Sequence, residues 1–187
     1  MKGRPTRELP PKDLPALPVE LIQEVKDFLR LDHGEDDAAI ARFASSAAHL
    51  CENFTGQMLI VRSLCDRIPA RADWQKLKRR PVQAITSVEA IAPDGNARAL
   101  PANDYAIDID GDGVGWVKLR AASNFQRIAV TYNAGLAVDW MTVPTTLRQG
   151  VVRLAGYLYS HRDGLDAAPP PSAVTALWRP HRRMRLA

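Results

Sequence analysis

The sequence predicts an α+β protein: mainly a helical bundle, with a small antiparallel β insertion and an extended C-terminal arm. Three observations support this prediction. Apolar residues recur at the 3.6-residue spacing of a helix in two segments near the start and in one segment after residue 143. Between them, over about residues 58–133, the pattern changes to the alternation and turn residues typical of strands. Three consecutive prolines then separate the last long helix from a basic end.

The first two helices are predicted over residues 18–30 and 35–55. The first is short, so packing must hold it. In the second, Asp32 is a candidate cap with Glu35 three positions on, and Asp36 and Asp37 complement the helix dipole. Gly56 supplies the left-handed stop. The apolar faces consist of Leu21, Ile22, Val25, Phe28 and Leu29 in the first helix, and of Ile40, Phe43, Ala44, Ala47, Leu50, Cys51 and Phe54 in the second.

The β insertion is predicted from short alternating runs and one strong turn. Residues 87–91 alternate as a half-buried strand does, and the turn signal at residues 93–96 predicts a hairpin. Further strands are expected over residues 105–107, 115–119 and 127–132. Cys65 falls in an expected strand and Cys51 on a helix stripe, so both are interpreted as small core residues rather than a disulfide.

A third helix is predicted over residues 144–162, with Pro144 at its first position. It closes the helical core of a single domain that spans residues 18–165. Residues 1–17 are interpreted as a flexible N-terminal extension, because they are rich in proline and charge and contain no apolar region of a secretory signal or anchor. No apolar run is long enough to span a membrane.

Two basic clusters stand out against a net charge of only +4. The first consists of Lys76, Lys78, Arg79 and Arg80, and it is either a solvated loop or edge strand, or a surface that faces DNA or a negatively charged partner. The second lies at the C-terminal end, after Trp178, and consists of Arg179, His181, Arg182, Arg183 and Arg185.

Residues 166–187 are interpreted as a proline spacer followed by a basic arm. Ser172 can cap a short helix that ends at Trp178. In one interpretation Val174, Leu177 and Trp178 fold back onto the chain's own core. In the other the spacer projects an anchor for a partner, because tryptophan and arginine are enriched where proteins dock. The docking hypothesis involves Leu177, Trp178, Arg179, Arg182, Arg183 and Arg185.

The segment 108–113 resembles the first half of a calcium loop. Asp108, Asp110 and Asp112 are weak metal candidates at alternate positions, followed by glycine. The twelfth position of such a loop would be Leu119 rather than glutamate, and the flanks are predicted strands. The segment is therefore interpreted as a structural, metal-free turn.

Known catalytic motifs are missing from the sequence. It has no glycine-rich phosphate loop, no nucleophile elbow, no Cys-x-x-Cys pair and no His-Glu-x-x-His. We therefore expect no enzyme activity and no cofactor.

Short motifs distributed over nearly the whole chain resemble the head-tail connector (adaptor) proteins of tailed phages and gene transfer agents. The motifs are Glu24-Val25-Lys26, Leu29-Arg30, Asp32-His33, Asp36-Asp37-Ala38, Glu52, Thr55-Gly56, Pro81-Val82, Ser87-Val88, residues 130–135, Val143-Pro144, Tyr159, Arg162 and Ala176-Leu177.

The resemblance implies a structural virion protein, assembled in the bacterial cytoplasm, with copies that form a ring below the portal vertex. Its implied partners are further copies of itself, the portal protein, a tail-proximal stopper or tail protein and the packaged DNA in the channel, with no membrane. The alternative function is a nucleic-acid-binding protein of a phage packaging system, which would use the two basic clusters.

Overall fold

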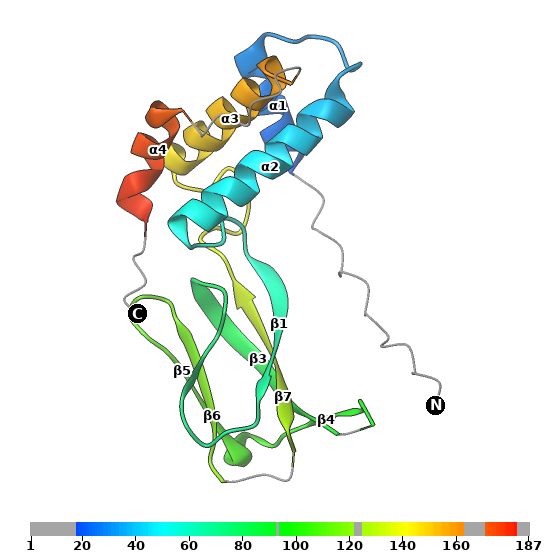
Figure 1. The fold of residues 1–187 in the computed structure, drawn as a ribbon, viewed down its shortest axis with the longest axis vertical. Coiled ribbons are helices and arrows are strands. Elements are labelled where there is room, and N and C mark those ends of the chain that lie inside the picture. Colours follow the sequence, from blue (N-terminus) through cyan, green and yellow to red (C-terminus); the bar gives the residue numbers. More distant parts are fainter. Residues whose placement is uncertain (1–17, 93, 122–124, 163–170, 183–187) are drawn as a thin grey trace, which may run out of the picture.

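The computed structural model describes residues 18–92, 94–121, 125–162 and 171–182. Helices gather at one end of an elongated molecule and strands at the other (Figure 1). The helical layer contains α1 (Val19–Leu29), α2 (Asp37–Thr55), α3 (Thr145–Ser160) and the short α4 (Ser172–Trp178). All strands lie between α2 and α3 in the sequence.

The helical layer is built around α3, which packs against each of the other helices. Its core is formed by most residues of the apolar faces that the helical spacing predicts, so burial of these faces stabilises the layer. Phe28, which was expected on the buried face of the first helix, is 53% exposed instead. Gly56 ends α2 in the left-handed conformation with a φ of 70°, as predicted. The larger members of this core are Leu21, Val25, Ile40, Trp140, Leu147, Val151, Leu154, Val174 and Trp178.

Two antiparallel sheets form the other end of the molecule. A four-stranded sheet has the order β1 (Arg62–Pro69), β7 (Arg127–Ala134), β3 (Val82–Ile91), β4 (Ala97–Ala99). A three-stranded sheet has the order β2 (Gln75–Lys76), β6 (Gly115–Leu119), β5 (Tyr105–Ile109). The predicted hairpin is confirmed, because β3 and β4 pair from Glu89 opposite Ala99 to Ile91 opposite Ala97.

The sheets enclose a hydrophobic core of their own, distinct from that of the helices. Tyr132 on the central strand β7 is fully buried in it. Side chains of both sheets contribute, so the two sheets pack face to face and together form the β layer of the molecule. The core consists of Met58, Ile68, Leu77, Val82, Val88, Val117, Leu119, Ile128, Val130, Tyr132 and Ala134.

The prediction of a mainly helical bundle with a small insertion is wrong. The two antiparallel sheets and their separate core make the β region a full structural layer. The expected extended C-terminal arm is wrong as well, since Ser172–Trp178 is a helix packed against α3. The error arose because edge strands such as β1 alternate only weakly, with charged residues and proline that blunt an exposed edge.

Three residue-level expectations also need correction. Leu50 is exposed and Phe43 only partly buried, where it meets Tyr159 edge-on at 6.3 Å between ring centroids. Cys65 is exposed rather than a core residue, whereas Cys51 is buried. Asp32 does not cap α2, which starts after Asp36 without a side-chain cap bond.

The chain crosses between the helical layer and the β layer twice, after α2 and after β7, and the two crossings lie side by side. The N–H of Val61 donates to the carbonyl of Ala137 at 2.8 Å, next to a bridge between Ile60 and Ala137. Gly135 makes this approach possible: a Cβ there would lie 2.3 Å from the nitrogen of Val61, and its φ is 156°. No helix in the described ranges is long and apolar enough to cross a membrane.

Candidate functional site

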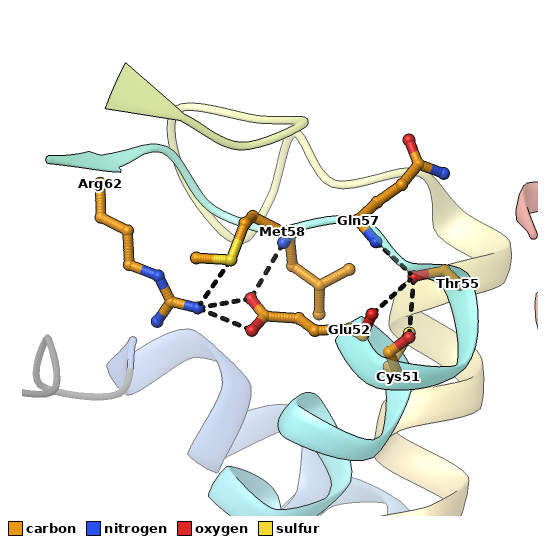
Figure 2. Close-up of polar contacts among 7 residues, drawn as sticks. Cys51, Glu52, Thr55, Gln57, Met58 and Arg62 are labelled. Atoms are coloured by element: carbon orange, nitrogen blue, oxygen red, sulfur yellow. Dashed lines mark hydrogen bonds and ion pairs between the residues drawn. The ribbon is translucent and has the colours of Figure 1, made fainter. Parts of the chain in front are cut away.

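The turn between α2 and β1 joins the helical layer to the sheets. Near the end of α2, Glu52 accepts the N–H of Leu59 at 3.1 Å and pairs with the guanidinium of Arg62 at 2.7 and 2.8 Å (Figure 2). The hydroxyl of Thr55 accepts the N–H of Gln57 at 3.3 Å. Because Glu52 is almost buried, its charge requires this complete set of partners. The turn therefore has one well-defined conformation.

The first basic cluster lies between β2 and β3, on a segment whose backbone is fixed. The N–H of Lys78 donates to Asp66 at 2.8 Å, and the N–H of Arg79 donates to the hydroxyl of Tyr132 at 3.2 Å. That hydroxyl in turn donates to Asp66 at 3.0 Å. Burial, and then the charge of Asp66, raises the pKa of Tyr132, so the hydroxyl remains a proton donor. The side chains of Lys78 and Arg79 are exposed.

Trp178 is buried in the helical core rather than projected outward. Its indole N–H donates to the carbonyl of Leu147 at 3.3 Å, and its ring lies 5.9 Å from that of Phe54. Gly150 on α3 leaves room for it, since a Cβ there would lie 2.1 Å from the indole nitrogen. Of the two interpretations of this segment, packing against the chain's own core describes the structure. In this position Trp178 is not exposed to a partner.

The segment that follows Trp178 brings the second basic cluster to the α2–β1 turn. The side chain of Gln57 donates to the carbonyl of His181 at 2.6 Å, and the guanidinium of Arg182 lies 5.6 Å from the ring of Phe54. From the other side, Arg80 donates to the carbonyl of Gly56 at 3.2 Å. The two basic clusters are therefore neighbours in space, although about a hundred residues separate them in the sequence.

The remaining members of the docking hypothesis lie in different environments. Leu177 is partly buried against the helical core. Arg179 and Arg182 are exposed, so they are accessible for contact. Arg183 and Arg185 lie outside the described residues. A docking role for these arginines stays a prediction.

The aspartate-rich turn is organised by one carboxylate. One oxygen of Asp110 accepts the N–H groups of Asp112 and Val114, each at 2.9 Å, and the other accepts the indole N–H of Trp116 at 2.9 Å. The hydrogen bond from Trp116, then that from Val114, lowers the pKa of Asp110. Asp108 is exposed and does not join these bonds. The carboxylate of Asp110 therefore serves the turn, and a metal-free turn stays a prediction.

The described residues contain no group of three or more histidine, cysteine, aspartate or glutamate side chains placed to hold a metal. Cys51 is buried, and desolvation followed by the charge of Glu52 raises the pKa of its thiol, so it is a poor nucleophile.

Sequence reasoning missed Gln57, Gly150 and the pairing of Glu52 with Arg62. Gly150 carried a usable signal, because glycine inside a helix often marks close packing. Gln57 and Arg62 carried none, since their partners are set by the tertiary fold.

The chain matches the head completion proteins over residues 21–165. It belongs to the head completion protein family. No curated protein matches the chain.

Solved structures of gene transfer agent particles contain chains similar to this head completion protein. A chain in the neck of an empty particle computed with C6 symmetry has a TM-score of 0.74 and 27% identity, over 92% of both chains. A chain in the neck of a native particle computed with C12 symmetry has a TM-score of 0.73 and 26% identity, over 92% of this chain and 91% of that one. A chain in the virion of a native particle has a TM-score of 0.73 and 25% identity, over 94% and 96%.

These similarities extend across both layers of the fold rather than over one motif. The resemblance to head-tail connectors that the sequence motifs carried is confirmed. This head completion protein is a structural virion protein of the phage-like type, and its role is that of a head-tail adaptor.

Proposed function

We propose that this head completion protein joins the head to the tail of a phage-like particle by forming a ring in the neck, between the portal vertex and the tail-proximal proteins. The observation that carries the proposal is the likeness of nearly the whole chain to chains in gene transfer agent necks. The family match over residues 21–165 supports the same role.

Ring formation places a requirement on the subunit. A closed ring of identical copies uses heterologous contacts, so each copy presents two different complementary faces. The elongated subunit, with helices at one end and sheets at the other, offers distinct faces for this purpose (Figure 1). We infer a ring of twelve copies from the C12 symmetry used for one similar neck.

The partners follow from the position of the ring. One side contacts the portal protein, the opposite side a stopper or tail protein, and the central opening carries the packaged DNA. The work is contact rather than catalysis, and the ring joins the particle during assembly in the bacterial cytoplasm.

The proposed function is tested by removing the gene from a strain that produces the particle. We expect electron micrographs to show DNA-filled heads and separate tails that are not joined, and expression of the chain in trans to restore joined particles. Normal numbers of tailed, infectious particles without the gene would contradict the proposal.

A second candidate function, DNA packaging, is favoured by the convergence of the two basic clusters at the α2–β1 turn. The same deletion distinguishes it. A packaging protein is needed before the head is filled, so its loss gives empty heads, whereas loss of an adaptor gives filled heads without tails.

A further inference from the structure

Both basic clusters contact the α2–β1 turn. Arg80 contacts this turn through the carbonyl of Gly56, and the carbonyl of His181 contacts it through the side chain of Gln57. Arg79 and Arg80 also line a hollow together with Gly56 and Gln57. Both clusters thus lie next to one turn. We name this surface the junction face, and it consists of Lys78, Arg79, Arg80, Arg179 and Arg182.

The junction face has a fixed frame and accessible charges. The backbone of Lys78 and Arg79 is held by Asp66 and Tyr132, and the position of Arg182 by the ring of Phe54. The side chains of Lys78, Arg79, Arg179 and Arg182 are nevertheless exposed, and that of Arg80 is partly exposed. A polyanion therefore meets prearranged cations, which lowers the entropy cost of binding.

Nearby carboxylates are occupied by other partners. Glu52 borders the hollow but is paired with Arg62, and Asp66 accepts the N–H of Lys78 and the hydroxyl of Tyr132. The carboxylates of Glu52 and Asp66 are therefore each engaged by groups other than the side chains of Lys78 and Arg79. Lys76 lies at its margin, with its ammonium 5.9 Å from the ring of Trp116.

The composition of the junction face argues against a typical protein-binding site. Such interfaces have an apolar core with aromatic or aliphatic anchors. Trp178 is buried, and Leu50, one helical turn before Phe54 on α2, is exposed beside the junction face rather than within it. Trp74, which is also exposed, is covered by the ammonium of Lys118 at 4.7 Å from its ring. A surface formed mainly by lysine and arginine suits phosphates.

We propose that the junction face binds the phosphate backbone of double-stranded DNA without reading its bases. The inference rests on the proposed function, which brings packaged DNA through the ring that this chain forms. Arginine forks pair with phosphate oxygens at two points, while lysine adds a mobile charge. The contacts carry no sequence information, so binding is weak, general and steeply dependent on salt.

The test measures binding of the full chain to a labelled duplex of about 30 base pairs by fluorescence anisotropy, between about 50 and 200 mM salt. If each of the five cations contacts one phosphate, a plot of the logarithm of the affinity against the logarithm of the salt concentration should have a slope of about −4 to −5. Two duplexes of unrelated sequence should bind equally. An absence of binding at the lowest salt would overturn the proposal.

A matched pair of double variants separates the junction face from general charge. Arg79→Glu with Arg182→Glu should lower the affinity at least about tenfold and flatten the slope by about 2. Arg98→Glu with Arg127→Glu changes net charge equally, on exposed positions of β4 and β7, and should have little effect. Equal losses in both would overturn the proposal. If the first variant melts below the parent, Arg79→Gln with Arg182→Gln replaces it; it removes the same two cations, so the slope should again flatten by about 2.

Two further results separate the proposal from its alternatives. Poly-L-glutamate at equal charge concentration should compete poorly with the duplex; equal competition would assign the face to an acidic protein surface and overturn the proposal. Duplex binding and the joining of heads to tails are measured separately, so the two proposals can fail separately. A chain that fails to bind duplex but still joins heads to tails refutes this inference alone. A chain that binds duplex while its gene is dispensable for joining refutes the proposed function alone.

Discussion

At the scale of single residues, Trp178 determines where the C-terminal helix lies. Its ring occupies the space that Gly150 leaves on α3, and its indole N–H is satisfied by the carbonyl of Leu147. An almost fully buried tryptophan contributes a large apolar area to the core. The stability of the chain therefore depends on the segment that follows the three prolines, α4.

We expect Trp178→Ala to lower the free energy of unfolding by about 3–5 kcal/mol, since it leaves a large cavity beside α3. Urea unfolding followed by circular dichroism measures this change. Trp74→Ala is the control, because Trp74 is 44% exposed and its truncation should cost less than about 1 kcal/mol. Equal, small effects of both substitutions would show that Trp178 is not a core residue in solution.

Asp110 offers a test of the aspartate-rich turn. Its pKa is lowered chiefly by the hydrogen bond from Trp116, so Trp116→Phe should raise that pKa toward the ordinary value. Since the pKa is lower in the folded than in the unfolded chain, the bond contributes stability above about pH 4, which is lost as pH falls through the folded value. Carboxyl NMR titration measures the shift.

The same titration contains its own control. The pKa of Asp94 is lowered by Asn96 in a different turn and should not change in the Trp116→Phe variant. An unchanged pKa at Asp110 would mean that the indole bond is not formed in solution.

At the scale of elements, the pair of Glu52 and Arg62 couples the end of α2 to the start of β1. The glutamate also holds the N–H of Leu59 in the intervening turn, so one side chain connects three consecutive pieces of the chain (Figure 2). This arrangement sets the direction in which β1 leaves the helical layer. It also places the first basic cluster beside the C-terminal segment.

Glu52→Ala should destabilise the fold by about 3–5 kcal/mol, because it leaves the Arg62 guanidinium and a buried N–H without their partner. Thermal and urea unfolding report the loss. Asp37→Ala, which removes the more exposed pair with Lys26, should cost less than about 1 kcal/mol. A Glu52→Ala variant as stable as Asp37→Ala would contradict the coupling role.

Elements in which apolar residues recur with a clear helical or strand periodicity were predictable from the sequence, and strands at sheet edges were not. The helical stripe of α2, the stop at Gly56 and the hairpin of β3 and β4 follow from local chemistry. Strand β2 has only two residues, and β1 lies at an edge where arginine and aspartate interrupt the alternation. What defines these strands is pairing, as of Cys65 with Thr131 on β7, which local sequence does not encode.

At the scale of the whole molecule, the junction face exists only because the two layers meet. The contact of Gln57 with His181 joins positions 124 residues apart, and that of Trp178 with Leu147 joins α4 to α3. Composition shows that each cluster is basic, but no local pattern indicates that they are neighbours. The family resemblance was predictable because it depends on the order of many short motifs, whereas the face depends on tertiary contacts.

The C-terminal segment allows folding and docking to be separated by two truncations. Removal of residues 172–187 takes Val174 and Trp178 out of the core, so we expect a chain that melts well below the parent or does not fold cooperatively.

Removal of residues 183–187 alone deletes Arg183 and Arg185 without removing a buried residue of the described structure. This shorter truncation should melt like the parent, as measured by circular dichroism. If these arginines dock to a partner, it should also yield fewer joined particles in complementation and electron microscopy. Normal joining by this stable chain would eliminate their docking role, and parent-like melting of the longer truncation would refute the placement of Trp178 in the core.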